Sequence, residues 1–76
     1  MELNKFVAHF AEQFEETEKS VFAPETVFHE LDEYSSLIAL SIISMIDEEY
    51  DVQINGNEMR TAVTIEDLYN IVKSKL

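Results

Sequence analysis

Residues 36–50 read SLIALSIISMIDEEY, and this stretch decides the fold. Apolar side chains recur in it at the i, i+3, i+4, i+7 and i+11 spacing of one buried helical face, namely Ala39, Ile42, Ile43, Ile46 and Tyr50. The pattern predicts an amphipathic helix from about Ser36 to Tyr50. Further apolar residues lie beside or outside that face, namely Leu37, Ile38, Leu40 and Met45. They indicate either a helix sandwiched between two others or an exposed patch that binds a partner, and Leu40 fits core and surface equally well.

The residues before this helix predict another helix and then a long connection. From about Glu2 to Thr17, helical spacing gives one apolar stripe, made of Leu3, Phe6, Val7, Phe10 and Phe14. The connection runs from about Glu18 to Ser35. A structureless loop of that length is unusual in a small domain unless it has a function or is held by apolar side chains that pack into the core, which we call pins. We expect its pins to be Val27, Phe28 and Leu31.

The residues after Tyr50 predict a short helix and a final helix. Ile54 and Met59 are the expected core contacts around a helical piece near residues 57–61. Thr64 is a typical N-cap, and it precedes an apolar stripe of Ile65, Leu68, Ile71 and Val72. We therefore predict an all-α fold, a small bundle of three main helices plus one short helix with a long first loop, in one domain over residues 1–76.

Charge and composition narrow the classes of function. Sixteen acidic and five basic residues give a net charge of -11, and no Lys or Arg lies between Lys19 and Arg60. The negative electrostatic potential of such a chain repels nucleic acid and anionic lipid and attracts basic protein surfaces. The chain has no cysteine, and neither His9 nor His29 has neighbours at metal-ligand spacing, so we expect no metal site and no enzyme activity. No segment has the pattern of a membrane span or a signal peptide, which favours a cytoplasmic protein.

Ser36 stands where the acidic connection gives way to the apolar helix. A hydroxyl in the first turn of a helix faces backbone N–H groups that have no intrahelical acceptor, and the helix dipole there favours negative charge. The position therefore suits a phosphate ester, although serine at a helix start is most often only a cap. The rest of the chain has to decide between these two interpretations.

From Phe28 to Val72 the sequence resembles the acyl carrier protein family. Members of that family carry a 4'-phosphopantetheine arm on the serine of an Asp-Ser-Leu motif at the start of their second helix, and Ser36 and Leu37 match its last two positions. The apolar helix that ends in Asp-Glu-Glu-Tyr-Asp and the isoleucine at Ile54 are similar to the family as well. The resemblance implies a helical carrier that holds acyl groups as thioesters on the covalent arm.

The aspartate of the family motif is replaced by Ser35, so two adjacent hydroxyls compete as the attachment site. Placing the arm on Ser36 aligns Leu37 and the helix that follows, whereas placing it on Ser35 would rotate every apolar residue by about 100° around the helix. We therefore predict that Ser36 is modified and that Ser35 is the N-cap.

The resemblance also implies partners: a phosphopantetheinyl transferase, and acyl-loading and condensing enzymes with basic docking surfaces that meet a monomeric carrier. We expect the partner contacts to be Glu33, Leu37, Ile38, Leu40, Ser41, Met45, Asp47 and Glu48. Docking should be less purely electrostatic than in the family, because Ile38 and Ser41 replace acidic residues typical of the early second helix. Two alternatives stay open: a carrier of amino acids, of the peptidyl or D-alanyl type, and an unmodified acidic helical adaptor.

Overall fold

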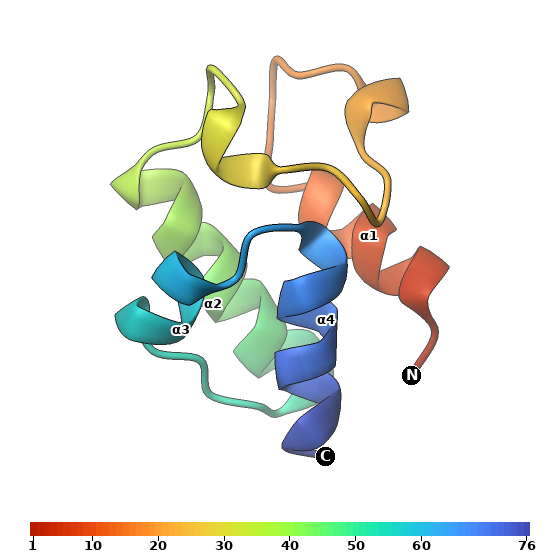
Figure 1. The fold of residues 1–76 in the computed structure, drawn as a ribbon, viewed down its shortest axis with the longest axis vertical. Helices are drawn as coiled ribbons and strands as arrows, with labels where there is room; N and C mark the ends of the chain where they lie inside the picture. The colour runs from red at the N-terminus through yellow and green to blue at the C-terminus, as the bar shows by residue number, and fades with distance from the viewer.

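The computed structural model describes all residues from 1 to 76, and its regular elements are helices (Figure 1). They are α1 (Leu3–Ala11), α2 (Ser36–Tyr50), α3 (Gly56–Thr61) and α4 (Ile65–Ser74), with two 3-10 turns at Lys19–Val21 and Phe28–Glu30. The one β feature is an isolated antiparallel bridge between Val27 and Thr64. The predicted all-α bundle of three main helices and one short helix is confirmed.

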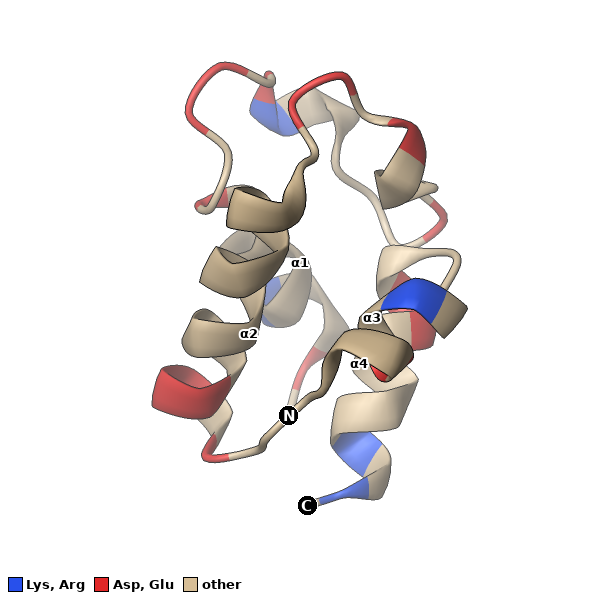
Figure 2. Cartoon of the chain, turned by 90° about the vertical axis from the view of Figure 1, so that its left-hand side faces the viewer, with Lys and Arg blue, Asp and Glu red and all other residues tan.

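Helix α2 begins and ends at the predicted residues. The Ser35 hydroxyl accepts a hydrogen bond from the Ile38 N–H at 3.3 Å, which makes Ser35 the N-cap as expected. At the other end, Asp51 adopts a left-handed conformation with φ 56° and donates its N–H to the Asp47 carbonyl, which stops the helix. Figure 2 shows the acidic residues of α2 gathered at this C-terminal end and no basic residue on the helix.

Helix α1 ends at Ala11, so its predicted extension to Thr17 was wrong. The N–H groups of residues 15–17, which a longer helix would use internally, donate instead to the carboxylate of Glu33. The amide of Gln13 caps the freed His9 carbonyl at 3.1 Å. Phe14 still reaches the core, with 3% of its surface exposed, because the chain turns inward after the helix. The apolar spacing was correct, but a carboxylate from the far end of the connection outcompetes the helical hydrogen bonds.

The long connection runs over the end of the bundle at which α2 begins (Figure 1), and it is ordered by its two 3-10 turns and its packing. Of the predicted pins, Phe28 is fully buried, whereas Val27 and Leu31 are half-buried. Phe22 is a further pin, with 9% exposed, that the sequence analysis did not single out. The N–H groups of Ile65 and Glu66 donate to carbonyls of the connection, and these bonds tie it to the start of α4.

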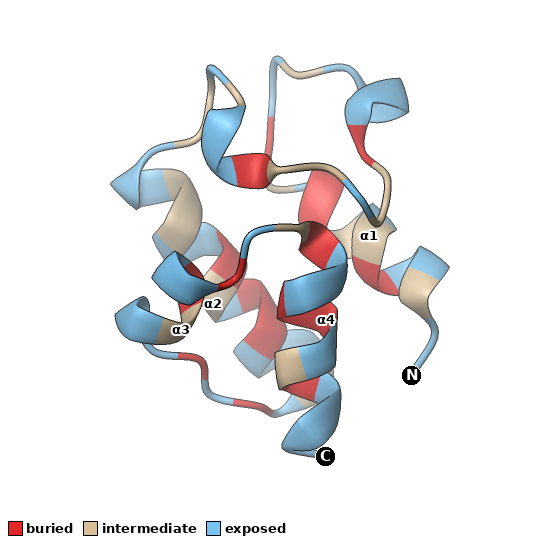
Figure 3. Cartoon of the chain, viewed as in Figure 1, coloured by how far each residue is buried: buried red, intermediate tan, exposed pale blue.

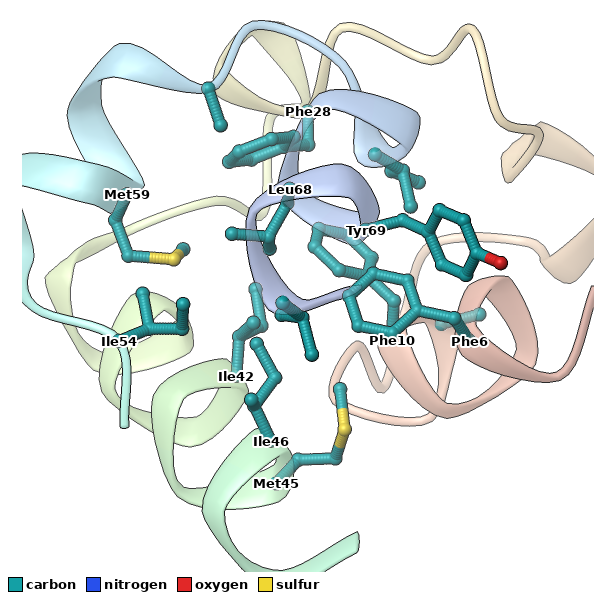
Figure 4. Close-up of a cluster of buried hydrophobic side chains, with 14 of the residues drawn as sticks. Phe6, Phe10, Phe28, Ile42, Met45, Ile46, Ile54, Met59, Leu68 and Tyr69 are labelled. Atoms are coloured by element: carbon teal, nitrogen blue, oxygen red, sulfur yellow. The ribbon is translucent and has the colours of Figure 1, made fainter. Parts of the chain in front are cut away.

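One hydrophobic cluster joins all four helices and the connection (Figures 3 and 4). Its fully buried side chains are Phe6, Phe10, Phe28, Ile42, Ile46, Ile65, Leu68 and Val72. The predicted core contacts Ile54 and Met59 are confirmed, with 5% and 3% exposed. Tyr69 was missed: its ring is nearly buried, and its hydroxyl donates to the Met1 carbonyl at 3.0 Å. No helix has the length and apolar character that crossing a bilayer requires.

Candidate functional site

Ser36 is the first residue of α2, and its side chain is exposed to solvent. Figure 3 shows the exposed N-terminal end of α2 beneath the connection. The hydroxyl of Ser35 is engaged as the cap of the Ile38 N–H, and the Ala39 N–H donates to the Ser35 carbonyl at 2.9 Å. The N–H groups of Ser36 and Leu37 are the first of the helix and have no intrahelical acceptor. The attachment candidate is therefore accessible and stands in an environment that favours an anion.

A groove of about 340 Å³ opens beside Ser36, between the first half of α2 and α3. We call it the α2–α3 groove, and its lining consists of His29, Tyr34, Ser35, Ser36, Ala39, Leu40, Ile43, Gly56, Met59 and Arg60. Much of this lining is apolar, and none of it is acidic, although acids outnumber bases about three to one in the chain. An apolar group tethered at Ser36 thus has an apolar wall next to it.

A second depression of about 440 Å³ lies on the opposite side of α2, and we call it the α1–α2 groove. It is lined by Glu12, Gln13, Leu37, Leu40, Ser41, Ser44, Met45, Glu48 and Glu49. The structure thus brings together five of the predicted partner contacts: Leu37, Leu40, Ser41, Met45 and Glu48. Leu37 and Leu40 are 78% and 59% exposed, which resolves the ambiguity at Leu40 in favour of the surface.

The prediction that Met45 lies beside or outside the buried face of α2 was wrong. Met45 is only 7% exposed and belongs to the core, because it lies one turn after Ile42 on the same side of the helix. Figure 4 shows its side chain directed into the buried cluster with Ile42 and Ile46. Met45 therefore forms the floor of the α1–α2 groove and exposes little surface to a partner.

The remaining predicted partner contacts lie apart from this groove. Ile38 is half-buried and packs against the core, and Asp47 is exposed near residues 53 and 54. The carboxylate of Glu33 accepts hydrogen bonds within the chain, so this residue has a structural role. Its contact with a partner stays a prediction. No group of three or more His, Cys, Asp or Glu side chains is arranged to hold a metal ion.

Glu33 fastens the connection to the end of α1. The Thr17 hydroxyl, at 2.7 Å, is the main cause that lowers the pKa of this carboxyl; partial desolvation opposes it, and the N–H groups of Glu15, Glu16 and Thr17 lower the pKa further. Because Glu33 lies three residues before Ser36, these bonds also fix the approach of the chain to the start of α2. The lowered pKa lets the carboxylate stay charged, and so keep these bonds, at pH values at which an ordinary glutamate would begin to protonate.

His29 fastens the same stretch of chain to α3. Its Nε2 donates to the carbonyls of Met59 at 2.9 Å and Ala62 at 3.1 Å, and since both partners are acceptors this nitrogen bears the proton. Tyr34 packs edge-on against the His29 ring at 5.0 Å, and burial raises the pKa of the Tyr34 phenol. These contacts set the distance between the Ser36 region and α3. No signal in the sequence indicated them, because the partners are backbone carbonyls 30 or more residues away.

Three features of this end of the molecule fit the 4'-phosphopantetheine arm implied by the sequence resemblance. Ser36 offers an exposed primary hydroxyl for the phosphodiester, and the first turn of α2 offers N–H groups to an anion. The α2–α3 groove offers an apolar wall and one cation, Arg60. The residues present therefore suit a group that is anionic at its point of attachment and extended beyond it.

Comparison with known proteins gives one match. A family model described as "Phosphopantetheine attachment site" matches residues 4–72, which is nearly the whole chain. No curated protein and no solved structure matches.

Proposed function

The chain belongs to the phosphopantetheine attachment-site family and is thus a carrier of covalent 4'-phosphopantetheine, and from this premise we propose that it is an acyl carrier protein whose arm is esterified to Ser36. The observation that supports the proposal is the exposed Ser36 hydroxyl at the first position of α2, beside a groove with an apolar lining. We further propose that residues 1–76 act as one monomeric carrier domain in the cytoplasm.

Ser36 is favoured over Ser35 by the different uses of the two hydroxyls. The Ser35 oxygen caps α2, and esterifying it would weaken an acceptor that the helix start uses. The Ser36 hydroxyl is exposed and stands clear of that bond. A phosphate on Ser36 would meet the free N–H groups of the first turn, so the modification leaves the cap intact and gains a favourable electrostatic environment.

The chain supplies the setting for thioester chemistry rather than a catalytic group. It has no cysteine, so the bound arm supplies the thiol on which an acyl group is held. The residues of the chain hold the phosphate end at α2, and the α2–α3 groove shelters apolar cargo from water. Ala39, Leu40, Ile43 and Met59 form the apolar part of that lining, which favours an acyl group over a small polar amino acid.

The α1–α2 groove is the proposed docking surface for partner enzymes. Two exposed leucines, Leu37 and Leu40, stand there beside the carboxylates of Glu12, Glu48 and Glu49. An apolar contact surrounded by acids suits a basic enzyme surface, because charge speeds the encounter while apolar burial supplies affinity. The phosphopantetheinyl transferase and the acyl-loading and condensing enzymes are the partners that we propose for it.

Intact mass after co-expression with a phosphopantetheinyl transferase tests the attachment site. The parent chain should gain the mass of one arm, Ser36→Ala should gain none, and Ser35→Ala should keep the gain. Circular dichroism of both variants checks that they fold. A mass gain that survives in Ser36→Ala and disappears in Ser35→Ala would place the attachment site at Ser35. No mass gain in the parent chain would favour the alternative that the protein is an unmodified acidic adaptor.

Loading the arm tests the cargo. We expect an octanoyl thioester to raise the melting temperature above that of the holo form, because the octanoyl group buries apolar surface in the α2–α3 groove. An alanyl thioester has one methyl group to bury and should change it little. If the alanyl form is stabilised as much as the octanoyl form, the groove does not distinguish a long apolar group from a short one. The argument that the arm carries acyl groups is then refuted.

Docking is tested by introducing a negative charge at an exposed apolar position, where a partner contact would have to bury it. Leu37→Glu should raise the KM of the transferase while the melting temperature stays close to that of the parent chain. Val63→Glu is the matched control, because Val63 is also exposed, at 52%, but lies outside the α1–α2 groove. Equal kinetic effects of the two variants would show that added negative charge matters and that the position does not.

A further inference from the structure

Arg60 is the one base in the long stretch of sequence between Lys19 and Lys73. No other Lys or Arg occurs between Lys19 and Lys73, and Figure 2 shows basic colour on α3 but none on α2. Its side chain lines the α2–α3 groove together with Ser36, although the two residues are 24 positions apart in the sequence. The only Lys or Arg between Lys19 and Lys73 is thus on the wall of the groove that begins at the proposed attachment site.

The Arg60 guanidinium is not neutralised within the chain. Its one internal hydrogen bond is from Nη2 to the Asn57 Oδ1 at 3.5 Å, the longest distance at which such a bond counts. The neighbouring carboxylate of Glu58 pairs with Lys75 at 2.8 Å instead. Since a guanidinium has five N–H donors, most of those of Arg60 are available to an outside acceptor.

The guanidinium lies at the edge of the groove. Its Nη1 is 3.7 Å from the place where a β-carbon on Gly56 would stand, which is an ordinary van der Waals distance, and Gly56 itself lines the groove. No Asp or Glu lines the groove. An anion that enters it therefore meets one cation at close range, and no carboxylate of the lining competes for that cation.

We propose that Arg60 binds the phosphodiester of the arm attached at Ser36 and so holds the arm along the α2–α3 groove. The inference rests on the proposed function, because it takes Ser36 as the attachment site. Arginine matches the paired oxygens of a phosphate with two parallel N–H bonds, which gives direction as well as attraction. On a chain with a net charge of -11, this contact offsets the repulsion that would otherwise push the phosphate away from the surface.

Apo and holo forms of the parent chain and of Arg60→Gln provide the test. Intact mass first establishes that each holo form bears its arm on Ser36, and failure at this step refutes the proposed function rather than the inference. Melting temperatures at low salt then give the holo-minus-apo difference for each chain. We expect this difference to be larger in the parent chain by about 2–4 °C, a shift typical of a weak charged contact in a domain of this size.

Lys5→Gln is the matched control for the loss of one positive charge. Lys5 is exposed on α1 and has only a loose ion pair with Glu2 at 4.0 Å, so its holo-minus-apo difference should equal that of the parent chain. The Arg60 effect should also shrink in 0.5 M NaCl, because salt screens an exposed pair. Nuclear magnetic resonance gives an independent readout: the Arg60 side-chain N–H signal should move when the arm is attached.

The inference is overturned if the arm is fully attached while Arg60→Gln and the parent chain show the same holo-minus-apo difference. An Arg60 side-chain signal that stays in place on attachment overturns it as well. In that event Arg60 is free to contact an acidic group on a partner enzyme, and its substitution would alter partner binding in the apo form.

Discussion

Replacing Phe28 tests whether the long connection is part of the cooperative core. The side chain is fully buried although it lies between helices, and its ring packs against Phe10 at 5.2 Å and Tyr34 at 5.4 Å. If the connection is held as firmly as the helices, Phe28→Ala should cost as much as truncating a phenylalanine in a helix core. If the connection packs only loosely on the bundle, Phe28→Ala should lose little unfolding free energy.

The expected magnitude follows from the burial. Truncating a fully buried phenylalanine costs about 3–5 kcal/mol of unfolding free energy, through lost apolar transfer and the cavity left behind. A chain of 76 residues has about 4–11 kcal/mol in total, so Phe28→Ala should lose a large share of its stability. Phe28→Leu keeps most of the apolar volume and should cost about 1–2 kcal/mol, which leaves it folded and measurable.

Urea unfolding followed by circular dichroism measures both variants against a control in the same connection. Val21→Ala removes apolar atoms that are 44% exposed, and its effect should stay within about 0.5 kcal/mol. The midpoints should fall in the order Val21→Ala, Phe28→Leu, Phe28→Ala, with an unchanged slope for the two folded variants. If Phe28→Ala costs no more than Val21→Ala, the connection unfolds separately and the reasoning about its packing is refuted.

Three further predictions concern charge and capping. Acid should remove the stability that Glu33, Glu58 and Asp67 contribute, because hydrogen bonds hold their pKa values below the ordinary ones; this contribution is complete at neutral pH and is lost below about pH 4, whereas protonation of the other carboxylates relieves part of the repulsion among them. The melting temperature should depend less on pH over that range in Glu33→Gln, and an unchanged profile would contradict this. Added NaCl should raise the melting temperature, because sixteen acids against five bases repel one another, and a constant or falling value would refute the argument. Thr64→Ala should lower it by about 4–8 °C through the loss of roughly 1 kcal/mol of N-cap energy, whereas Thr61→Ala, which removes no cap, should change it little.

The helices that were predictable have local causes. The bounds of α2 follow from the apolar period and from a cap hydroxyl, both of which lie inside the helix or next to it. The start of α4 is likewise local, since Thr64 and Asp67 form a capping box within four residues. Local hydrogen bonds and side-chain periodicity can be read from a sequence without knowledge of the tertiary fold.

The failures have causes that are distant in sequence. The early end of α1 depends on Glu33, which is 16 to 18 residues away from the N–H groups that it binds. The width of the α2–α3 groove depends on His29, whose acceptors are carbonyls on and after α3. Backbone N–H and C=O groups are the same in nearly every residue, so the sequence does not indicate which of them a distant side chain will bind.

The same distinction explains which parts of the candidate site were visible in advance. Ser36 was found because its position at the start of α2 and the family resemblance both point to it, whereas the exposure of Leu40 was decided only by the structure. Arg60 was noted only as the end of an interval without bases, and its meaning depends on the fold, which places α3 across the groove from the start of α2. In a chain where acids outnumber bases about three to one, the importance of one base depends on where the fold places it, and so a site residue can stand out in the structure without standing out in the sequence.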